Sequence, residues 1–278
     1  MRIIHTVLEL RNALAGVRGI AFVPTMGNLH EGHLSLIERA RDVGDLVVAS
    51  IFVNRLQFAP DEDFGIYPRT LERDCDLLRH AGCDVVFVPA ERELYPEEQT
   101  FKVLPSPELA NVLEGEFRPG FFTGVCTVVL KLFNILQPSF AVFGKKDCQQ
   151  LFVVRRMVKQ FALPIDIVAC ETIRAADGLA LSSRNGYLSA HERVEAATLS
   201  RELMHVASEV REGRRDWTAL ESGAVSSLRK QGWDPDYVAI RSLRDFGTPR
   251  AGDDLVVLGA ARLGSTRLID NFDFGMLI

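Results

Sequence analysis

Apolar runs alternate with amphipathic segments through the first two thirds of the chain, and this alternation most constrains the fold. The run Leu46–Val53 is almost continuously apolar and rich in valine, as expected for a strand that is covered on both faces. Between it and the shorter run Ile20–Pro24, apolar residues recur at helical spacing over His33–Val43. A strand, a helix and a second strand form a βαβ unit, so we expect a parallel sheet.

The same pattern continues along the chain and then changes. Further helix and strand pairs are expected at 69–81 and 84–89, 123–136 and 140–143, and 149–161 and 165–169. After about residue 175, two long helical stretches precede three strand candidates, at 190–212, 217–231, 237–242, 254–261 and 266–270. Helices followed by strands are typical of an α+β arrangement. The sequence therefore predicts a parallel α/β domain over residues 1–175 and a smaller α+β domain over 176–278.

Composition and charge exclude several classes of function. With 278 residues and 47% hydrophobic residues, the chain can bury a substantial core. Its formal net charge of −5 argues against general binding to nucleic acid or anionic membranes, although a local basic pocket remains possible. Charged residues interrupt Met1–Gly19, so no signal peptide is expected, and the best apolar run is far below the roughly 20 residues of a membrane helix. We expect a cytoplasmic protein.

The cysteines favour a reducing compartment. The chain has an odd number of them, and none forms a CxxC pair. They are Cys75, Cys83, Cys126, Cys148 and Cys170. We expect free, mostly buried thiols rather than a disulfide framework or a zinc site.

The most informative stretch for chemistry is Pro24–His33, which joins a predicted strand to a predicted helix. Open parallel sheets bind ligands at such junctions. Gly27 and Gly32 would let the backbone approach a ligand, and the helix would point unpaired N–H groups at an anion. His30 and His33 could then donate to phosphate oxygens as negative charge shifts. The alternatives are a metal-binding pair without an evident third ligand, or two surface histidines in a turn.

Two further blocks have candidate phosphate ligands. Gly144-Lys145-Lys146-Asp147 follows a predicted strand and opens a helix, where two lysines run against the usual preference for acids. A bound polyanion would explain that conflict, whereas the alternative is a solvated turn. In Leu181-Ser182-Ser183-Arg184, the guanidinium of Arg184 could hold phosphate by two hydrogen bonds. The alternative there is a serine-capped turn with a surface arginine.

Several blocks together carry a resemblance to a known family. His30-Glu31-Gly32-His33 has the His-x-Gly-His pattern of the nucleotidyltransferase superfamily, which includes class I aminoacyl-tRNA synthetases. Longer stretches resemble the pantothenate synthetase (pantoate–β-alanine ligase) family. These are Pro24–Leu36, Ser50–Asn54 with Gln57-Phe58, Tyr67–Leu71, Lys131–Asn134, Ala176–Asn185 and Arg267–Asn271.

The resemblance implies a fold and a reaction. It implies a Rossmann-like domain over residues 1–175 that binds ATP and pantoate, a lid domain over 176–278, and a homodimer. ATP adenylates the carboxylate of (R)-pantoate and releases diphosphate, and the amine of β-alanine then displaces AMP to give pantothenate. Mg²⁺ is expected to accompany ATP, held mainly by phosphate and water rather than by assigned protein ligands.

The resemblance also assigns residues. The implied catalytic residues are His30, His33, Lys146 and Arg184, with His33 as general acid or phosphate stabiliser. Gln57 and Gln150 hold pantoate, and Gln57 also contacts β-alanine. The implied ATP-binding residues are Met26, Gly27, Asn28, Leu29, His30, Glu31, Gly32, His33, Gly144, Lys145, Lys146, Asp147, Ile173, Leu181, Ser182, Ser183 and Arg184.

The chain departs from the family pattern at several positions. Arg55 stands where proline is usual, Lys145 where glutamate is usual, and Cys148 where an aromatic residue is common. Phe121 and Thr123 replace the histidine and arginine of many members. Two other functions stay open on these grounds: a related nucleotidyltransferase acting on another small acid, and a catalytically silent nucleotide-binding protein.

Overall fold

The computed structural model describes residues 1–60 and 62–273 and divides the chain into two compact units. Unit 1 contains Met1–Lys145 and Gln150–Cys170, and unit 2 contains Lys146–Gln149 and the chain from Glu171 onward. The division falls at 170/171, whereas the sequence predicts a domain boundary at 175/176. Unit 2 also takes in a short segment, 146–149, that the sequence assigns to the first domain.

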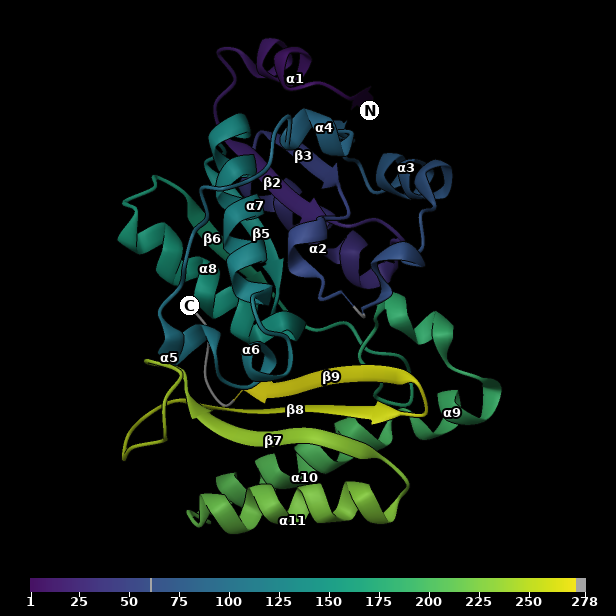
Figure 1. The fold of residues 1–278 in the computed structure, drawn as a ribbon, viewed down its shortest axis with the longest axis vertical. Helices are drawn as coiled ribbons and strands as arrows, with labels where there is room; N and C mark the ends of the chain where they lie inside the picture. The colour runs from purple at the N-terminus through teal and green to yellow at the C-terminus, as the bar shows by residue number, and fades with distance from the viewer. Residues whose placement is uncertain (61, 274–278) are drawn as a thin grey trace. The chain divides into compact units, whose positions relative to one another are not determined.

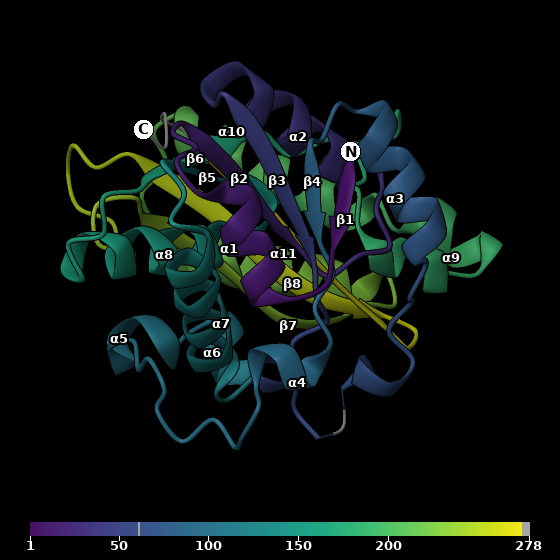
Figure 2. The ribbon, with the colours of Figure 1, turned by 90° about the horizontal axis from the view of Figure 1, so that it is seen from above.

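Unit 1 is built on a six-stranded parallel sheet, which confirms the predicted α/β class (Figure 1). Its order is β1-β4-β3-β2-β5-β6. The strands are β1 (Arg2–Ile4), β2 (Ile20–Thr25), β3 (Leu46–Ile51), β4 (Val85–Phe87), β5 (Phe140–Gly144) and β6 (Asp166–Cys170). The chain winds outward from β2 through β3 to β4 on one side and from β5 to β6 on the other, as Figure 2 shows. The order reverses between β2 and β5, where such sheets bind ligands beyond the carboxyl ends of the strands.

Helices and short turns connect these strands. The α-helices are α1 (Val7–Leu14), α2 (Glu31–Val43), α3 (Leu71–His80), α4 (Glu91–Leu94), α5 (Pro107–Ala110), α6 (Glu114–Phe117), α7 (Phe121–Leu136) and α8 (Cys148–Gln160). The 3-10 turns are η1 (Arg55–Gln57), η2 (Asp63–Gly65) and η3 (Lys145–Asp147). Apolar side chains of β2, β3 and α2 form a shared core, with Val23, Ile37 and Ala49 fully buried. All five cysteines are free and buried, as expected from the sequence.

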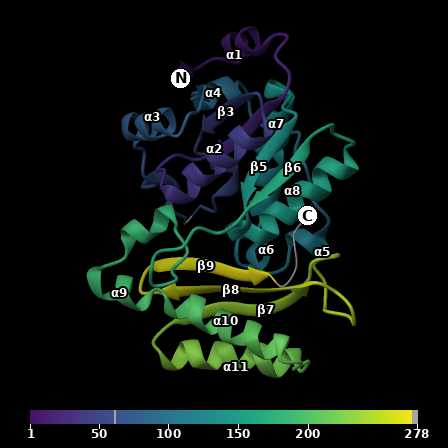
Figure 3. The same ribbon diagram turned by 180° about the vertical axis from the view of Figure 1, so that it is seen from behind.

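Unit 2 combines an antiparallel sheet with helices. The strands β7 (Asp234–Ser242), β8 (Leu255–Leu263) and β9 (Thr266–Asp273) pair in that order. The helices α10 (Thr198–Arg211) and α11 (Trp217–Lys230) cover one face of this sheet (Figure 3). The predicted single helix over 190–212 is two helices in the structure, since α9 (Ala190–Glu195) and α10 are separated by the fully buried Ala196 and Ala197. The 3-10 turn η4 (Ser183–Tyr187) precedes α9. Within residues 1–60 and 62–273, no helix combines the length and apolarity that a membrane span requires.

Candidate active site

The two histidines of the His-x-Gly-His sequence cap the helix that follows β2. His30 is the N-cap residue of α2, and its Nδ1 accepts from the backbone N–H of Gly32 at 3.1 Å. In return, the backbone N–H of His30 donates to Nδ1 of His33 at 3.3 Å. The two rings lie with their centroids 4.1 Å apart. This reciprocal arrangement is a capping box made of histidines instead of the usual serine and glutamate.

The capping box determines where each neutral imidazole has its proton. A backbone N–H can only donate, so Nδ1 of His30 and Nδ1 of His33 both act as acceptors and are unprotonated. In each neutral ring the proton is therefore on Nε2. Both histidines thus offer an Nε2–H donor of the kind that can stabilise a phosphoryl oxygen.

One sequence expectation about this helix is wrong for two of its first N–H groups. The sequence predicts unpaired N–H groups at the start of α2 that point at an anion, but Gly32 N–H donates to the His30 ring and His33 N–H donates to the His30 carbonyl at 2.7 Å. The reason is that His30, an uncommon N-cap residue, itself accepts from both of these donors.

A buried carboxylate from α3 holds the loop that leads to these histidines. Asp74 is fully buried, and its two oxygens accept from the backbone N–H groups of Asn28 and Leu29, each at 2.8 Å. Gly27 has a φ of +81°, and a Cβ there would lie 3.0 Å from Oδ2 of Asp74, so the loop requires glycine. Thr70 donates its hydroxyl to the same carboxylate at 3.1 Å. The sequence did not reveal this role, because an acid in the first turn of a helix is common on electrostatic grounds alone.

Gln57 and Met26 are brought together in unit 1. Nε2 of Gln57 lies 3.1 Å from Sδ of Met26, and Oε1 accepts from Nδ2 of Asn54 at the same distance. Asn54 is 1% exposed and also donates to the carbonyl of Gly124 at 3.2 Å. Asn54 stands in one of the blocks that resemble the family, but spacing alone indicated no role for it.

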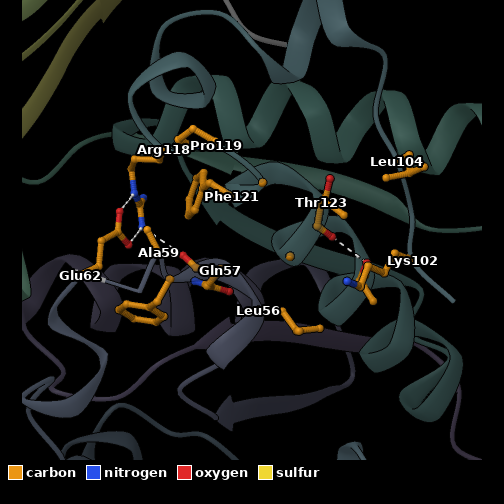
Figure 4. A pocket seen from close by; sticks show the side chains of 14 residues that line it. Leu56, Gln57, Ala59, Glu62, Lys102, Leu104, Arg118, Pro119, Phe121 and Thr123 are labelled. Carbon is orange, nitrogen blue, oxygen red and sulfur yellow. Dashed lines mark hydrogen bonds and ion pairs between the residues drawn. The ribbon is translucent and has the colours of Figure 1, made fainter. Parts of the chain in front are cut away.

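A cavity of about 330 Å³ lies beside Gln57 (Figure 4). Arg118 at its edge forms a two-pronged ion pair with Glu62, with N–O distances of 2.6 and 2.8 Å, and also donates to the Gln57 carbonyl. The guanidinium carbon of Arg118 lies 3.8 Å from the ring centroid of Phe121. The two departures Phe121 and Thr123 both line this cavity. Phe121 therefore has a packing role in place of a polar one.

Helix α7 approaches η1 so closely that only glycine fits at the contact. A Cβ on Gly124 would lie 2.0 Å from the carbonyl oxygen of Leu56 and 2.7 Å from the backbone nitrogen of Gln57. Both neighbours are main-chain atoms and cannot rotate away. The position of Gln57 is therefore set directly by the packing of α7.

In unit 2, strand β9 anchors the segment that contains Lys146. Nδ2 of Asn271 donates to the carbonyl of Lys146 at 2.8 Å. The neighbouring Asp270 is 5% exposed and accepts two hydrogen bonds from Arg174, at 2.6 and 2.8 Å. Arg174 also donates to the carbonyl of Gly178 at 3.0 Å. Sequence reasoning missed Arg174 as a site-building residue, because its partner lies 96 positions away.

A hairpin held by Arg174 brings two predicted site residues together. The backbone N–H of Leu181 donates to the carbonyl of Ile173 at 2.9 Å. The following turn is closed locally, because Ser182 Oγ accepts from the backbone N–H of Arg184 at 3.3 Å and Asn185 donates to the Ala180 carbonyl. The predicted residues Ile173, Leu181, Ser182, Ser183 and Arg184 thus form one local structure.

The predicted site residues divide into two groups, one in each unit. Unit 1 contains Met26 to His33, Gln57, Gly144, Lys145 and Gln150, whereas unit 2 contains Lys146, Asp147, Ile173 and Leu181 to Arg184. Lys145 is buried, and Gln150 is partly exposed in the first turn of α8. Among the described residues, no group of three or more His, Cys, Asp or Glu side chains could hold a metal ion.

Comparisons with known proteins agree over almost the whole chain. A family model described as pantoate-beta-alanine ligase matches residues 2–273. Pantothenate synthetase of Leptothrix cholodnii is 62% identical, over 98% of this chain and 100% of the relative. The enzyme of the same name from Paracidovorax citrulli is 59% identical, over 99% of this chain and 100% of that relative.

Solved structures give the same result for the fold. The crystal structure of pantothenate synthetase from Thermus thermophilus matches with a TM-score of 0.91 and 45% identity, covering 98% of this chain and 99% of that chain. Pantoate-beta-alanine ligase from Francisella tularensis, complexed with beta-gamma ATP and beta-alanine, matches with a TM-score of 0.80 and 34% identity, covering 98% and 97%. The chain therefore belongs to the pantoate–β-alanine ligase family.

Proposed function

We propose that this chain catalyses the ATP-dependent condensation of (R)-pantoate with β-alanine, giving pantothenate, AMP and diphosphate. The observation that carries the proposal is the pair of Nε2–H donors of His30 and His33 at the β2–α2 junction of a family member. The solved structure of one family member, from Francisella tularensis, holds beta-gamma ATP and β-alanine. These ligands support ATP and β-alanine as co-substrates of this chain.

The reaction has two displacement steps. A carboxylate oxygen of pantoate attacks the α-phosphorus of ATP, and the bond to the β-phosphate oxygen breaks, so that diphosphate leaves with its electron pair. The amine of β-alanine then attacks the acyl carbon of pantoyl adenylate, the bond from that carbon to the AMP oxygen breaks, and the nitrogen loses a proton. Neither step needs a protein nucleophile, so the protein supplies positioning, charge stabilisation and exclusion of water.

The residue roles are those that the family resemblance implies, and the donors of these side chains support them. His30 and His33 stabilise the phosphoryl oxygens during adenylation, and Lys146 and Arg184 neutralise the departing diphosphate. Gln57 and Gln150 hold pantoate, and Gln57 also contacts β-alanine, for which the cavity lined by Gln57 and Arg118 offers space. The nucleotide contacts comprise Met26, Gly27, Asn28, Leu29, Glu31, Gly32, Gly144, Lys145, Asp147, Ile173, Leu181, Ser182 and Ser183. Mg²⁺ would arrive with ATP, bound by phosphate and water, and would offset phosphate charge.

The first experiment is an omission assay of AMP formation. With Mg²⁺, ATP, pantoate and β-alanine present, we expect AMP that requires both organic substrates and disappears when EDTA removes the metal. Diphosphate exchange into ATP with pantoate alone would support the adenylate. A related nucleotidyltransferase would form AMP only with another acid, and a silent nucleotide-binding protein would bind ATP without releasing diphosphate. Either result would contradict the proposed function.

We also propose that the chain forms a homodimer in the cytoplasm and that residues 176–278 act as a lid. Two large apolar side chains of unit 1 support an interface, because Phe101 is 88% exposed and Leu104 is 77% exposed. In sedimentation analysis we expect twice the chain mass for the natural sequence and the single mass for a Phe101→Asp, Leu104→Asp variant. Leu8→Asp, in the exposed part of α1, is the matched control and should remain dimeric. A natural chain that sediments as a monomer would contradict the proposal.

A further inference from the structure

A glutamine that recognises a substrate can present either a donor or an acceptor, depending on which way its amide is turned. The NH2 group donates and the oxygen accepts, so a 180° rotation exchanges the two roles. For Gln57, neighbouring groups determine this choice. The role of these neighbours in substrate recognition rests on the proposed function, in which pantoate is the substrate at Gln57.

The carbonyl of Gly124 and the hydroxyl of Tyr95 fix the amide of Asn54. The Gly124 carbonyl can only accept, so the NH2 group of Asn54 must face it, at 3.2 Å. The oxygen of Asn54 consequently faces the opposite side, where the hydroxyl of Tyr95 donates to it at 2.8 Å. Burial raises the pKa of the Tyr95 phenol well above its ordinary value, so this hydroxyl remains a donor throughout the physiological pH range.

The fixed amide of Asn54 in turn orients Gln57. Nδ2 of Asn54 donates to Oε1 of Gln57 at 3.1 Å, which leaves Nε2 of Gln57 toward Sδ of Met26. A thioether is a weak acceptor. A carboxylate or hydroxyl oxygen of a substrate would replace it with a stronger hydrogen bond. Met26 belongs to the same loop as the capping histidines.

Tyr95 is itself held in place by its surroundings. It follows the last residue of α4, and its ring packs against Phe52 with a centroid distance of 6.0 Å. Nζ of Lys131 lies 4.4 Å from the Tyr95 ring centroid and donates to the carbonyl of Leu94 at 2.6 Å. The hydroxyl therefore has little freedom to leave Asn54.

We propose that Tyr95 is a positioning residue that, through Asn54, holds the Gln57 amide with its NH2 group ready to donate to pantoate. Gln57 then selects a substrate oxygen that accepts a hydrogen bond, such as a carboxylate or hydroxyl oxygen. Removing the Tyr95 hydroxyl would leave the oxygen of Asn54 buried without its donor, which loosens the Asn54 amide and thus Gln57.

The test is a double-mutant cycle on kcat/KM for pantoate at saturating ATP and β-alanine. We expect Tyr95→Phe to lower this value about tenfold in the natural background, with the KM for ATP unchanged. In a Gln57→Ala background, Tyr95→Phe should cause no further loss, because Tyr95 and Asn54 then have no Gln57 amide to orient. Tyr237→Phe, which removes a hydroxyl from β7 in unit 2, should leave kcat/KM unchanged.

A second variant tests the orientation of the amide directly. Gln57→Glu preserves an oxygen for Asn54 but replaces the NH2 group with a second acceptor, so it should lower kcat/KM for pantoate further than Gln57→Ala does. Two results would overturn the proposed positioning of Gln57 by Tyr95 while leaving the proposed function intact. One is an equal loss of kcat/KM for Tyr95→Phe in both backgrounds, and the other is a Gln57→Glu variant that is more active than Gln57→Ala. Failure of the natural chain to form AMP from pantoate would instead overturn the proposed function, and with it the proposed role of Tyr95. Thermal unfolding of each variant shows whether it is folded.

Discussion

Replacing His33 with alanine is expected to lower pantoate-dependent AMP formation by about 10²–10³-fold, the usual effect of removing one preorganised donor to a transition state. The substitution removes the Nε2–H donor that the capping box prepares. It also removes the Nδ1 acceptor that receives the backbone N–H of His30. The remaining histidine then loses part of its support, so the two losses act on the same step.

The measurement is the rate of diphosphate release with ATP and pantoate, before β-alanine is added, so that adenylation alone is observed. His80→Ala is the matched control, because His80 lies exposed at the end of α3 and should leave the rate unchanged. Since one N-cap hydrogen bond contributes only about 1 kcal/mol to helix stability, the variant should remain folded. A folded His33→Ala protein that adenylates at the natural rate would remove His33 from the mechanism.

The order of predicted elements, and with it the fold class, was accessible from local sequence. Buried parallel strands such as Leu46–Ile51 are continuous apolar runs, and the long helix between β2 and β3 has a regular apolar face. The strand order was not accessible, because it depends on which strands pair across the sheet. The first strand, Arg2–Ile4, was missed because three residues, one of them the charged Arg2, are too few to show a period.

The candidate site divides in the same way between local and distant contributions. His30, His33 and the Ser182–Arg184 turn were found because their geometry is made by neighbours in sequence. The groups that hold them in place were not found, because Asp74 contacts residues 45 and 46 positions away and Asp270 contacts Arg174 at a separation of 96. The expectation of free N–H groups failed at Gly32 and His33 for a different reason, since it assumed that histidine would not cap its own helix.

Asp74→Ala is expected to damage both stability and catalysis. The change removes the acceptor of three hydrogen bonds, two from the backbone N–H groups of Asn28 and Leu29 and one from the hydroxyl of Thr70. It leaves the backbone N–H of Leu29 buried without its partner. An orphaned buried donor costs about 1–3 kcal/mol, so the two amides together should lower the free energy of unfolding by about 3 kcal/mol. The loop from Gly27 to His30 would also shift, and a displacement of about 1 Å at reacting groups can lower a rate by about 10²-fold.

Asp76→Ala provides the matched control for this prediction. Asp76 lies two positions further along the same helix, but its carboxylate is exposed and pairs with Arg79 at 2.5 Å. An exposed pair of this kind contributes about 0–1 kcal/mol. Urea unfolding and the adenylation rate, measured on both variants, separate the role of the buried carboxylate from a general effect of removing negative charge from α3. If Asp74→Ala matched Asp76→Ala in both measurements, the buried carboxylate would not be what positions the histidine loop.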